Sequence, residues 1–439
     1  MRSSLPKVLQ TLGGRPMLAH LLETAAKLNP EQVHVVIGSG AEQVKATCDG
    51  VGVNWVIQEQ RRGTGHAVMQ VMPGIPDDAL VLVLLGDHPL IPASVLFEMM
   101  DKNQAPLSVL TMELDKPRGY GRIERDRNGR ISGVIEDRDA TPTQWKIREV
   151  NTGIILADAA QLRHWLDGLN CDNSKQEYYL TDIFAMAHRE KKEIHGVLAP
   201  DARDLQGAND RRQLAALERR YRQLATRRLM DEGVHIIDPQ RVEIRGKVEV
   251  GQDVSLDINV VLEGTNILAD GVTIGPGAVL KDCHLAAGTR VHAYSVLEGV
   301  RTSGPCDIGP FARVRPGTEL AAGTRIGNFV EVKNTSLGEG SKASHLSYLG
   351  DTSIGEDVNI GAGTITCNYD GVNKHRTVIE DGAFIGSGSQ LVAPVTVGKA
   401  ATIGAGTTLT KDAPSQALTV SRAKQVTLKN WQRPSKEDS

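Results

Sequence analysis

The chain has 439 residues, too many for one ordinary hydrophobic core, so two or three domains are expected. Its 50 Lys and Arg nearly balance 53 Asp and Glu, which gives a formal net charge of −3 and no electrostatic case for a nucleic-acid partner. The longest apolar run, residues 79–86, is far shorter than the roughly 18 residues of a membrane span, and the N-terminus has no apolar signal-peptide region, so no membrane partner is expected.

Between residue 6 and about residue 200, helical and strand patterns alternate. Apolar spacing near 3.6 residues predicts helices, and short runs rich in Val and Ile predict buried strands. The predicted elements are a helix over 17–28, strands over 33–38 and 54–58, a helix over 63–72 and a strand over 79–87. This alternation favours an α/β domain with a mainly parallel sheet that is covered by helices on both faces.

Ligands bind such sheets at the carboxyl ends of the strands, so the loops 58–67, 84–91 and 149–153 are the first candidates for a binding site. Asp87 stands at the end of the apolar run that begins at residue 79. A carboxylate there can hold a hard cation through oxygen, whereas the plainer interpretation is an Asp that caps the next element. The position at a strand end favours the metal.

Residues 209–232 predict one long helix that ends at Gly233. Seven arginines lie between 211 and 228, which suggests RNA binding at first sight. They are interleaved with Glu218 and Asp231 and lack an aromatic stacking set, so a solvated face on a connecting helix is the better interpretation. The apolar side of this helix is predicted to comprise Leu214, Leu217, Tyr221, Leu224 and Leu229.

The second half of the chain is a repeat with a period of about six residues, and Gly often follows the aliphatic residue. This period is typical of a parallel β-helix, in which one aliphatic residue of each hexapeptide points into a narrow core. A narrow core has room for few rings, which agrees with an aromatic content of only 4%. The repeat positions are Val250, Leu256, Leu262, Leu268, Ile274 and Leu280, then Ile308, Val314, Leu320, Ile326, Val332, Leu337, Ala343, Leu349, Ile354 and Ile360, and, after an interruption, Ile385, Leu391, Val397, Ile403 and Leu409.

These hexapeptides resemble those of the left-handed β-helix acyltransferases, and the left-handed winding is implied by that resemblance. ASHLSYLGD and NIGAGTITCNYDG in the second half, with LPKVL, GTGHA, LLGDHPLI, GYGRI and EVNTG in the first, resemble the bacterial bifunctional N-acetylglucosamine-1-phosphate uridylyltransferase / glucosamine-1-phosphate N-acetyltransferase family. The resemblance covers nearly the whole chain. It implies a nucleotidyltransferase domain over 1–208, a connecting helix over 209–233, and a left-handed β-helix acetyltransferase domain with a polar tail over 234–439.

For acetyl transfer, an amine must lose a proton, and a His is the usual base near neutral pH. A lone His is more often structural, but the resemblance assigns His345 as the base, because family motif residues surround it. The resemblance further implies that Arg315 and Lys333 hold the sugar phosphate, where the alternative is two solvated surface charges. Cys367 as a nucleophile is disfavoured, since amine attack on a thioester needs no enzyme-bound acyl group. The remaining implied contacts are Tyr348 and Asn359 for the sugar, and Ala362, Asn368, Tyr369, Ser387, Ala405 and Arg422 for acetyl-CoA.

For uridylyl transfer, the resemblance implies Mg²⁺ held by Asp87 and Asn209, and Lys7 on phosphate. Asn209 is equally suited to cap the helix that follows, and the two roles are compatible. The other implied substrate contacts are Gly86 beside Asp87, Gln58, Gly63 and Thr64 on the uracil side, and Gly121, Glu136 and Asn151 on the sugar side.

Two departures from the family pattern concern this site. Leu85 stands where the family has a Tyr, which removes one hydroxyl contact. The family also begins with an apolar strand and a glycine-rich phosphate loop, of which only Met1 corresponds to the last residue. The resemblance therefore implies a sheet that is incomplete at its N-terminus, and a true start upstream is favoured over a fresh truncation.

The resemblance implies a homotrimer with two activities. Acetyl-CoA acetylates glucosamine 1-phosphate, and UTP then converts the product to UDP-N-acetylglucosamine for cell-wall and lipopolysaccharide synthesis. The alternative is an acetyltransferase whose first domain is inactive. A non-catalytic β-helix scaffold is a third hypothesis, against which His345, Arg315 and Lys333 argue together. The five cysteines form no CxxC pair, as expected of reduced thiols in the cytoplasm.

Overall fold

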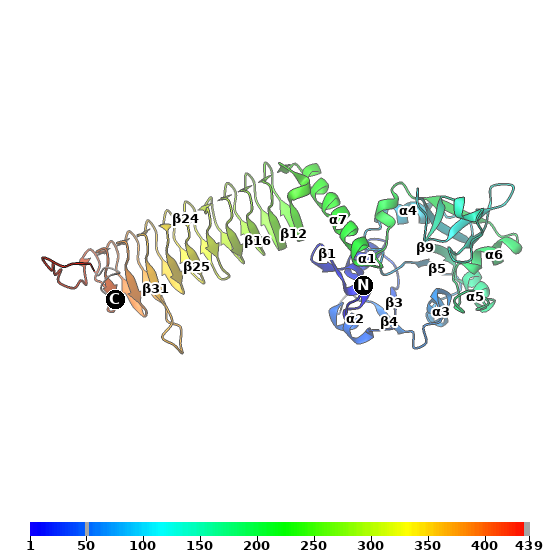
Figure 1. The fold of residues 1–439 in the computed structure, drawn as a ribbon, viewed down its shortest axis with the longest axis horizontal. Helices are drawn as coiled ribbons and strands as arrows, with labels where there is room; N and C mark the ends of the chain where they lie inside the picture. The colour runs from blue at the N-terminus through cyan, green and yellow to red at the C-terminus, as the bar shows by residue number, and fades with distance from the viewer. Residues whose placement is uncertain (49–51, 434–439) are drawn as a thin grey trace. The chain divides into compact units, whose positions relative to one another are not determined.

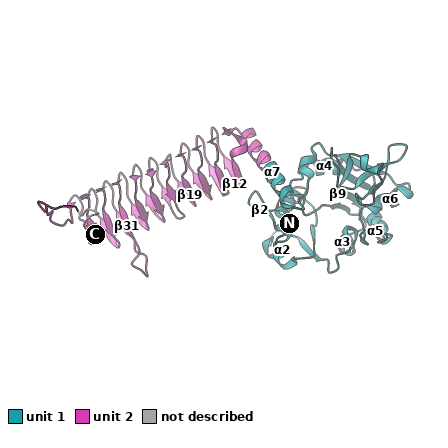
Figure 2. Ribbon diagram, in the orientation of Figure 1, with its two compact units in different colours: residues 1–221 teal, residues 222–439 magenta. Residues whose placement is uncertain are grey.

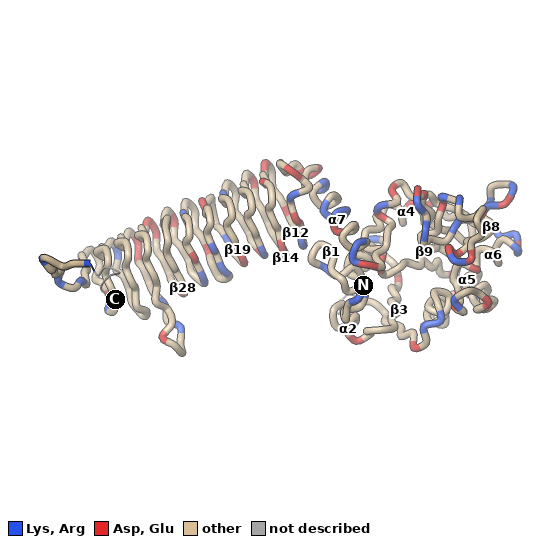
Figure 3. Tube along the Cα trace, in the orientation of Figure 1, with Lys and Arg blue, Asp and Glu red and all other residues tan. Residues whose placement is uncertain are grey.

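The computed structural model describes residues 1–48 and 52–433. The chain divides into two compact units, residues 1–221 and 222–439, and helix α7 (Arg211–Asp231) crosses the division (Figure 2). Along both units, Lys and Arg are interspersed with Asp and Glu (Figure 3). Among the described residues, no helix has the length and apolar character needed to cross a lipid bilayer.

The first unit is an α/β domain (Figure 1). Its principal sheet has the order β10-β6-β9-β7-β8, with β5 paired to β9, while β3 and β4 form a separate parallel pair. The strands are β3 (His34–Ile37), β4 (Asn54–Ile57), β5 (Leu80–Val83), β6 (Leu107–Glu113), β7 (Arg122–Arg125), β8 (Ile131–Ile135), β9 (Glu149–Asp158) and β10 (Ile194–Leu198), with the short pair β1 (Thr11–Leu12) and β2 (Arg15–Pro16). The helices are α1 (Met17–Ala26), α2 (Ala41–Thr47), α3 (Thr64–Met69), α4 (Ala93–Asp101), α5 (Ala159–Asp167) and α6 (Asp182–Arg189), with 3-10 turns at Lys7–Leu9, Met72–Gly74, Gln144–Lys146 and Ala202–Leu205.

Strand β9 departs from the expected parallel pairing. It lies antiparallel to both β5 and β6, so β5, β6 and β10 share one direction and β9 runs against them. The cause is local, because β7, β8 and β9 pair antiparallel through a hairpin that returns the chain into the sheet from the opposite end. The sequence patterns before residue 100 gave no sign of this hairpin.

Helices cover both faces of the principal sheet, as predicted. Successive residues of β9 point to opposite faces. Ile155 packs in the core that contains α5 and α6, whereas Ile154 packs in the core that contains α4 and part of α1. Two apolar cores therefore sandwich the sheet, and its strand ends are left to form the site.

The predicted helix over 17–28 and the strands over 33–38 and 54–58 are confirmed, as is a helix that begins after Gly63. The prediction that the third strand runs to Asp87 is wrong, since β5 ends at Val83. The N–H of His88 donates to the carbonyl of Leu85 at 3.0 Å, and this turn lifts the chain out of the sheet before Asp87. Asp87 accordingly lies on a loop beyond the strand end.

The second unit is a left-handed parallel β-helix of short strands (Figure 1). One face is an eleven-stranded parallel sheet made of β11 (His235–Ile236), β13 (Ser255–Leu256), β15 (Thr273–Ile274), β18 (Arg290–Val291), β21 (Asp307–Ile308), β24 (Arg325–Asn328), β27 (Lys342–His345), β30 (Asn359–Ile360), β33 (Phe384–Ile385), β36 (Thr402–Ile403) and β38 (Leu418–Thr419). The other strands are β12 (Glu243–Val250), β14 (Val261–Leu268), β16 (Val279–Lys281), β17 (His284–Leu285), β19 (Val296–Glu298), β20 (Arg301–Thr302), β22 (Arg313–Val314), β23 (Glu319–Leu320), β25 (Glu331–Lys333), β26 (Ser336–Leu337), β28 (Tyr348–Gly350), β29 (Thr352–Ile354), β31 (Ile365–Cys367), β32 (Thr377–Ile379), β34 (Gln390–Val392), β35 (Val395–Val397) and β37 (Thr408–Leu409).

The predicted repeat positions form the core of this β-helix. Every one of them from Leu256 to Leu409 is buried in a single apolar column, and Val250 packs against it from the edge. The predicted interruption is also present, because the chain between β31 and β32 leaves the coil and projects from it as a loop (Figure 1). Stacked coils bury a continuous core that no single hexapeptide could bury alone.

Candidate functional site

Lys7, Asp87 and Asn209 meet at one point in the first unit. The Lys7 ammonium donates to Asp87 Oδ2 at 2.5 Å and to Asn209 Oδ1 at 2.9 Å. Two oxygens from segments far apart in sequence thus converge on one cation. Hard oxygen donors of this kind suit Mg²⁺, so the residues present fit the metal that the resemblance implies. Within the described residues, no group of three or more His, Cys, Asp or Glu side chains is placed to hold a metal ion, so these two oxygens would need help from substrate phosphates or water.

The local structure explains why Asn209 can face this point. The helix cap that was considered for Asn209 is made by Asp210, whose carboxylate accepts from the N–H groups of Arg212 and Gln213 at 2.8 Å each. The Asn209 side chain is therefore available for Lys7. Gly86 lies against Val8, which brings the Asp87 loop close to the Lys7 turn.

The predicted uracil-side residues also lie together. Gln58 donates to the carbonyl of Gly63 at 3.3 Å and contacts His66 at 2.9 Å. Gly63 has a φ of +108° and approaches the Tyr178 carbonyl so closely that a Cβ would lie 2.6 Å from it, so Gly is required there. Thr64 accepts from the Leu180 N–H at 3.2 Å, which anchors the start of α3.

The predicted sugar-side residues form a third group. The carbonyl of Gly121 accepts from the N–H of Asn151 at 2.9 Å, and Glu136 lies beside Gly121. The Glu136 carboxylate accepts from Thr181 at 3.1 Å. Backbone and side-chain bonds thus hold all three positions at the edge of β7 and β9.

Two residues near Asp87 were missed from the sequence. Burial, followed by the Asp87 carboxylate, raises the pKa of the Tyr120 phenol, so a hydroxyl does lie in the electric field of Asp87 although Leu85 replaces the family Tyr. Burial lowers the pKa of His88, whose Nε2 lies 3.9 Å from Asp87 Oδ1 and whose Nδ1 has no hydrogen-bond partner among the described residues. Tyr120 was next to a quoted motif glycine, which was the available signal.

In the second unit, His345 is exposed at the end of β27. Its Nδ1 lies 3.0 Å from Asn328 Oδ1 on the preceding coil. Because an amide oxygen only accepts, this contact places the proton on Nδ1 and leaves Nε2 free to accept one. Asn328 was missed from the sequence, although it lies 17 residues before His345, which is one coil of the β-helix here.

His345 heads a column of small residues. Ala343, Ile360, Ile385 and Ile403 are register partners on successive coils, so His345 is followed by Ala362, Ser387 and Ala405. The residue that follows each member of this column is Leu346 on the first coil and a glycine on the next three coils. A Cβ built on Gly363 or on Gly388 would lie 3.6 to 4.0 Å from the glycine of the next coil. Beyond His345, therefore, Ala362, Ser387, Ala405 and the glycines beside them form a surface without bulky side chains, which we call the track. The Arg422 guanidinium lies beside Gly404 at its far end.

The predicted phosphate-binding cations lie on the neighbouring face. Arg315 and Lys333 are consecutive rungs of one column, since Val314 pairs with Val332. Lys374 from the projecting loop is a neighbour of Lys333, and this second cation, together with burial, lowers the pKa of the Lys333 ammonium. Glu331 pairs with Arg315 at 2.9 Å. Lys374 was not predicted from the sequence, although the basic stretch NKHR within the interruption of the repeat was an available signal.

The other predicted contacts lie elsewhere on these coils. Asn359 begins β30 on the His345 face, and Tyr348 begins β28. Asn368 is buried and donates to Asp351 at the base of the projecting loop, while Tyr369 is exposed on that loop. Within one chain, the track and the column of Arg315 and Lys333 are therefore two separate groups, on either side of one corner of the coil. Asn368 and Tyr369 do not lie at the track.

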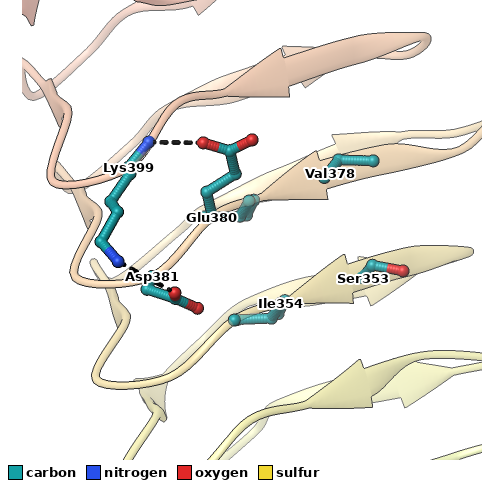
Figure 4. A pocket seen from close by; sticks show the side chains of 8 residues that line it. Ser353, Ile354, Val378, Glu380, Asp381 and Lys399 are labelled. Atoms are coloured by element: carbon teal, nitrogen blue, oxygen red, sulfur yellow. Dashed lines mark hydrogen bonds and ion pairs between the residues drawn. The ribbon is translucent and has the colours of Figure 1, made fainter. Parts of the chain in front are cut away.

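A shallow groove of about 420 Å³ lies on the third face, at β29 and β32 (Figure 4). Lys399 pairs with Asp381 at 3.5 Å across it, and the Lys399 N–H donates to Glu380 at 2.7 Å. None of the predicted site residues lines it.

Residues 1–121 match the model of the MobA-like NTP transferase domain, and residues 376–411 match the model of the bacterial transferase hexapeptide with six repeats. The chain is 52% identical over 434 residues to the bifunctional protein GlmU of Alkalilimnicola ehrlichii, which covers 99% of this chain and 94% of the relative. It is 51% identical over 439 residues to the bifunctional protein GlmU of Marinobacter nauticus and 53% identical over 438 residues to that of Xylella fastidiosa. In each case the match covers 96% of the relative. With both units matched by relatives of this kind, the chain belongs to the bifunctional GlmU family.

Proposed function

We propose that the chain carries out two successive transfers in the synthesis of UDP-N-acetylglucosamine, acetyl transfer in the second unit and uridylyl transfer in the first. The observation that carries this proposal is that similarity of 51–53% to bifunctional relatives spans both units. The parts are proposed to be a nucleotidyltransferase domain over 1–208, a connecting helix over 209–233 and an acetyltransferase domain over 234–439, acting in the cytoplasm.

For acetyl transfer, the amine of glucosamine 1-phosphate attacks the thioester carbon of acetyl-CoA. The new C–N bond forms as the C–S bond breaks, and His345 Nε2 takes the amine proton and returns it to the departing thiolate. Asn328 holds the imidazole in the tautomer that can accept this proton. Arg315, Lys333 and Lys374 offer three cations to the sugar phosphate. Tyr348 and Asn359 complete the sugar contacts, and the track of Ala362, Ser387 and Ala405 with Arg422, Asn368 and Tyr369 is proposed to receive acetyl-CoA.

For uridylyl transfer, a phosphate oxygen of N-acetylglucosamine 1-phosphate attacks the α-phosphorus of UTP, and pyrophosphate leaves. Asp87 and Asn209 would hold Mg²⁺, which would supply charge neutralisation at the phosphates. Lys7 bonds to the same two oxygens. With the metal in that position, the Lys7 ammonium would be released to neutralise a neighbouring phosphate oxygen. Gln58, Gly63 and Thr64 are proposed to hold uracil, and Gly86, Gly121, Glu136 and Asn151 the sugar, so that the two reactants are positioned in line.

We further propose a homotrimer, and an exposed ladder on the β-helix supports self-association. The rings of Tyr294, Phe311 and Phe329 stack at 5.4 Å between successive centroids, and Leu346 continues the ladder beside His345. All four residues have positive φ, a conformation that is unfavourable for bulky side chains. An apolar ladder kept at this cost suits contact with another copy, which would also bring missing groups to the track.

Phe311→Asp should therefore convert the assembly to monomers, because a carboxylate cannot be buried within a ring stack. Light scattering after size-exclusion chromatography measures the mass. Acetyl transfer should fall with the trimer, whereas pyrophosphate release should persist. Leu198→Asp, at an exposed apolar residue of the first unit, is the matched control and should remain a trimer. A trimeric Phe311→Asp protein contradicts the role of the ladder.

The test of the proposed function is a pair of assays on one preparation. Pyrophosphate release is measured with UTP, N-acetylglucosamine 1-phosphate and Mg²⁺, and CoA thiol release with acetyl-CoA and glucosamine 1-phosphate. Both products are expected. Acetyl transfer without pyrophosphate release would show that the chain is an acetyltransferase only. The absence of both products would reject the proposal.

A further inference from the structure

Tyr348 and Gly350 occupy alternate positions of the short strand β28, with the core residue Leu349 between them. Both positions consequently face outward from the coil. Gly350 pairs with Lys333 on the coil before it, and Cys367 follows on the coil after it. The column that carries Arg315 and Lys333 thus has an empty rung at Gly350.

The Tyr348 ring fills that empty rung. A Cβ built on Gly350 would lie 2.5 Å from Tyr348 Oη, 2.7 Å from Cζ and 2.8 Å from Cε1. The phenol end of Tyr348 therefore lies directly over the Gly350 backbone, instead of extending away from the coil. Since successive rungs are roughly 4.8 Å apart, the hydroxyl is brought in line with Arg315 and Lys333.

The backbone of Gly350 is held in place beneath the ring. Its N–H donates to Thr366 Oγ1 at 2.7 Å, and its carbonyl accepts from Thr366 at 3.1 Å and from Thr352 at 2.9 Å. Thr352 and Thr366 are both fully buried. The strand has no room to retreat, so a side chain at Gly350 could be accommodated only by moving the Tyr348 ring.

We propose that Gly350 is a positioning residue for acetyl transfer, whose missing side chain lets the Tyr348 hydroxyl join Arg315 and Lys333 as a further donor to the sugar phosphate. This inference rests on the proposed acetyl transfer. Glycine is needed here for the space above it and not for its backbone freedom, because Gly350 is not among the glycines with positive φ.

The test is steady-state acetyl transfer by Gly350→Ala. KM for glucosamine 1-phosphate should rise about tenfold or more, the loss expected for a hydrogen bond to a charged group. KM for acetyl-CoA and pyrophosphate release by the first unit should stay unchanged. Tyr348→Phe, which keeps the ring and removes only the hydroxyl, should show most of the same rise in KM.

The decisive comparison is the double variant Tyr348→Ala/Gly350→Ala against Tyr348→Ala alone. With the ring gone, the added methyl has room, so the two should have the same KM and the same melting temperature. If Gly350→Ala alone is unstable, a stable double variant still supports the proposal. An unchanged KM in Gly350→Ala, or a double variant that is worse than Tyr348→Ala or unfolded, overturns it. Absence of acetyl transfer in the unmodified chain would instead reject the proposed function.

Discussion

Replacement of His345 by Ala should lower the rate of acetyl transfer by about 10²–10⁴-fold, the usual contribution of a positioned general base. The reason is geometric as well as chemical. His345 stands at the head of the track, and its Nδ1 is engaged by Asn328, so Nε2 is the nitrogen left for the amine proton. Thiol release from acetyl-CoA measures the rate, and pyrophosphate release by the same sample should be unchanged.

His292→Ala is the matched control for this experiment. His292 is also exposed on the same β-helix, but its ring faces Asp307 at 3.5 Å, several coils away from the track. Its removal should leave acetyl transfer within about twofold, as expected for a surface substitution. Normal acetyl transfer by His345→Ala, with the trimer intact, would show that another group takes the proton.

The converse result is expected for Asp87→Ala, which should lower pyrophosphate release by at least about a hundredfold while acetyl transfer stays intact. Asp87 supplies a carboxylate at the point where Lys7 and Asn209 meet. Without it the remaining amide oxygen is a weak ligand for a hard cation, and Lys7 loses its carboxylate partner. Added Mg²⁺ at high concentration should restore little of the activity.

Asp77→Ala provides the control for a lost carboxylate in the same unit. Asp77 is exposed and pairs with Arg163 at 3.1 Å on the surface, so its removal should change pyrophosphate release little. Full activity of Asp87→Ala would show that residues other than Asp87 hold the metal. His88 and Tyr120, which lie around Asp87, would then be the next residues to replace.

The sequence determined the β-helix more completely than the α/β domain. Residues such as Ile308, Leu349 and Ile403 recur with a period that only stacked coils can bury, and the structure buries them all. In the first unit the same reasoning found the helices and the first strands but not the antiparallel course of β9. Pairing direction depends on which hairpin returns the chain, and that information is not contained in the periodicity of one segment.

For the sites, the sequence and the family resemblance named the residues with conspicuous chemistry, such as Lys7, Asp87 and His345. Only the tertiary structure decided how they work together. Asn328 and Lys374 acquire a role because coil stacking and a projecting loop place them against His345 and Lys333. Gly350 has no reactive group at all, and its proposed role is the space that it leaves for Tyr348. A sequence records which groups are present, whereas the distances and vacant volumes between segments far apart in the chain arise only when the chain folds.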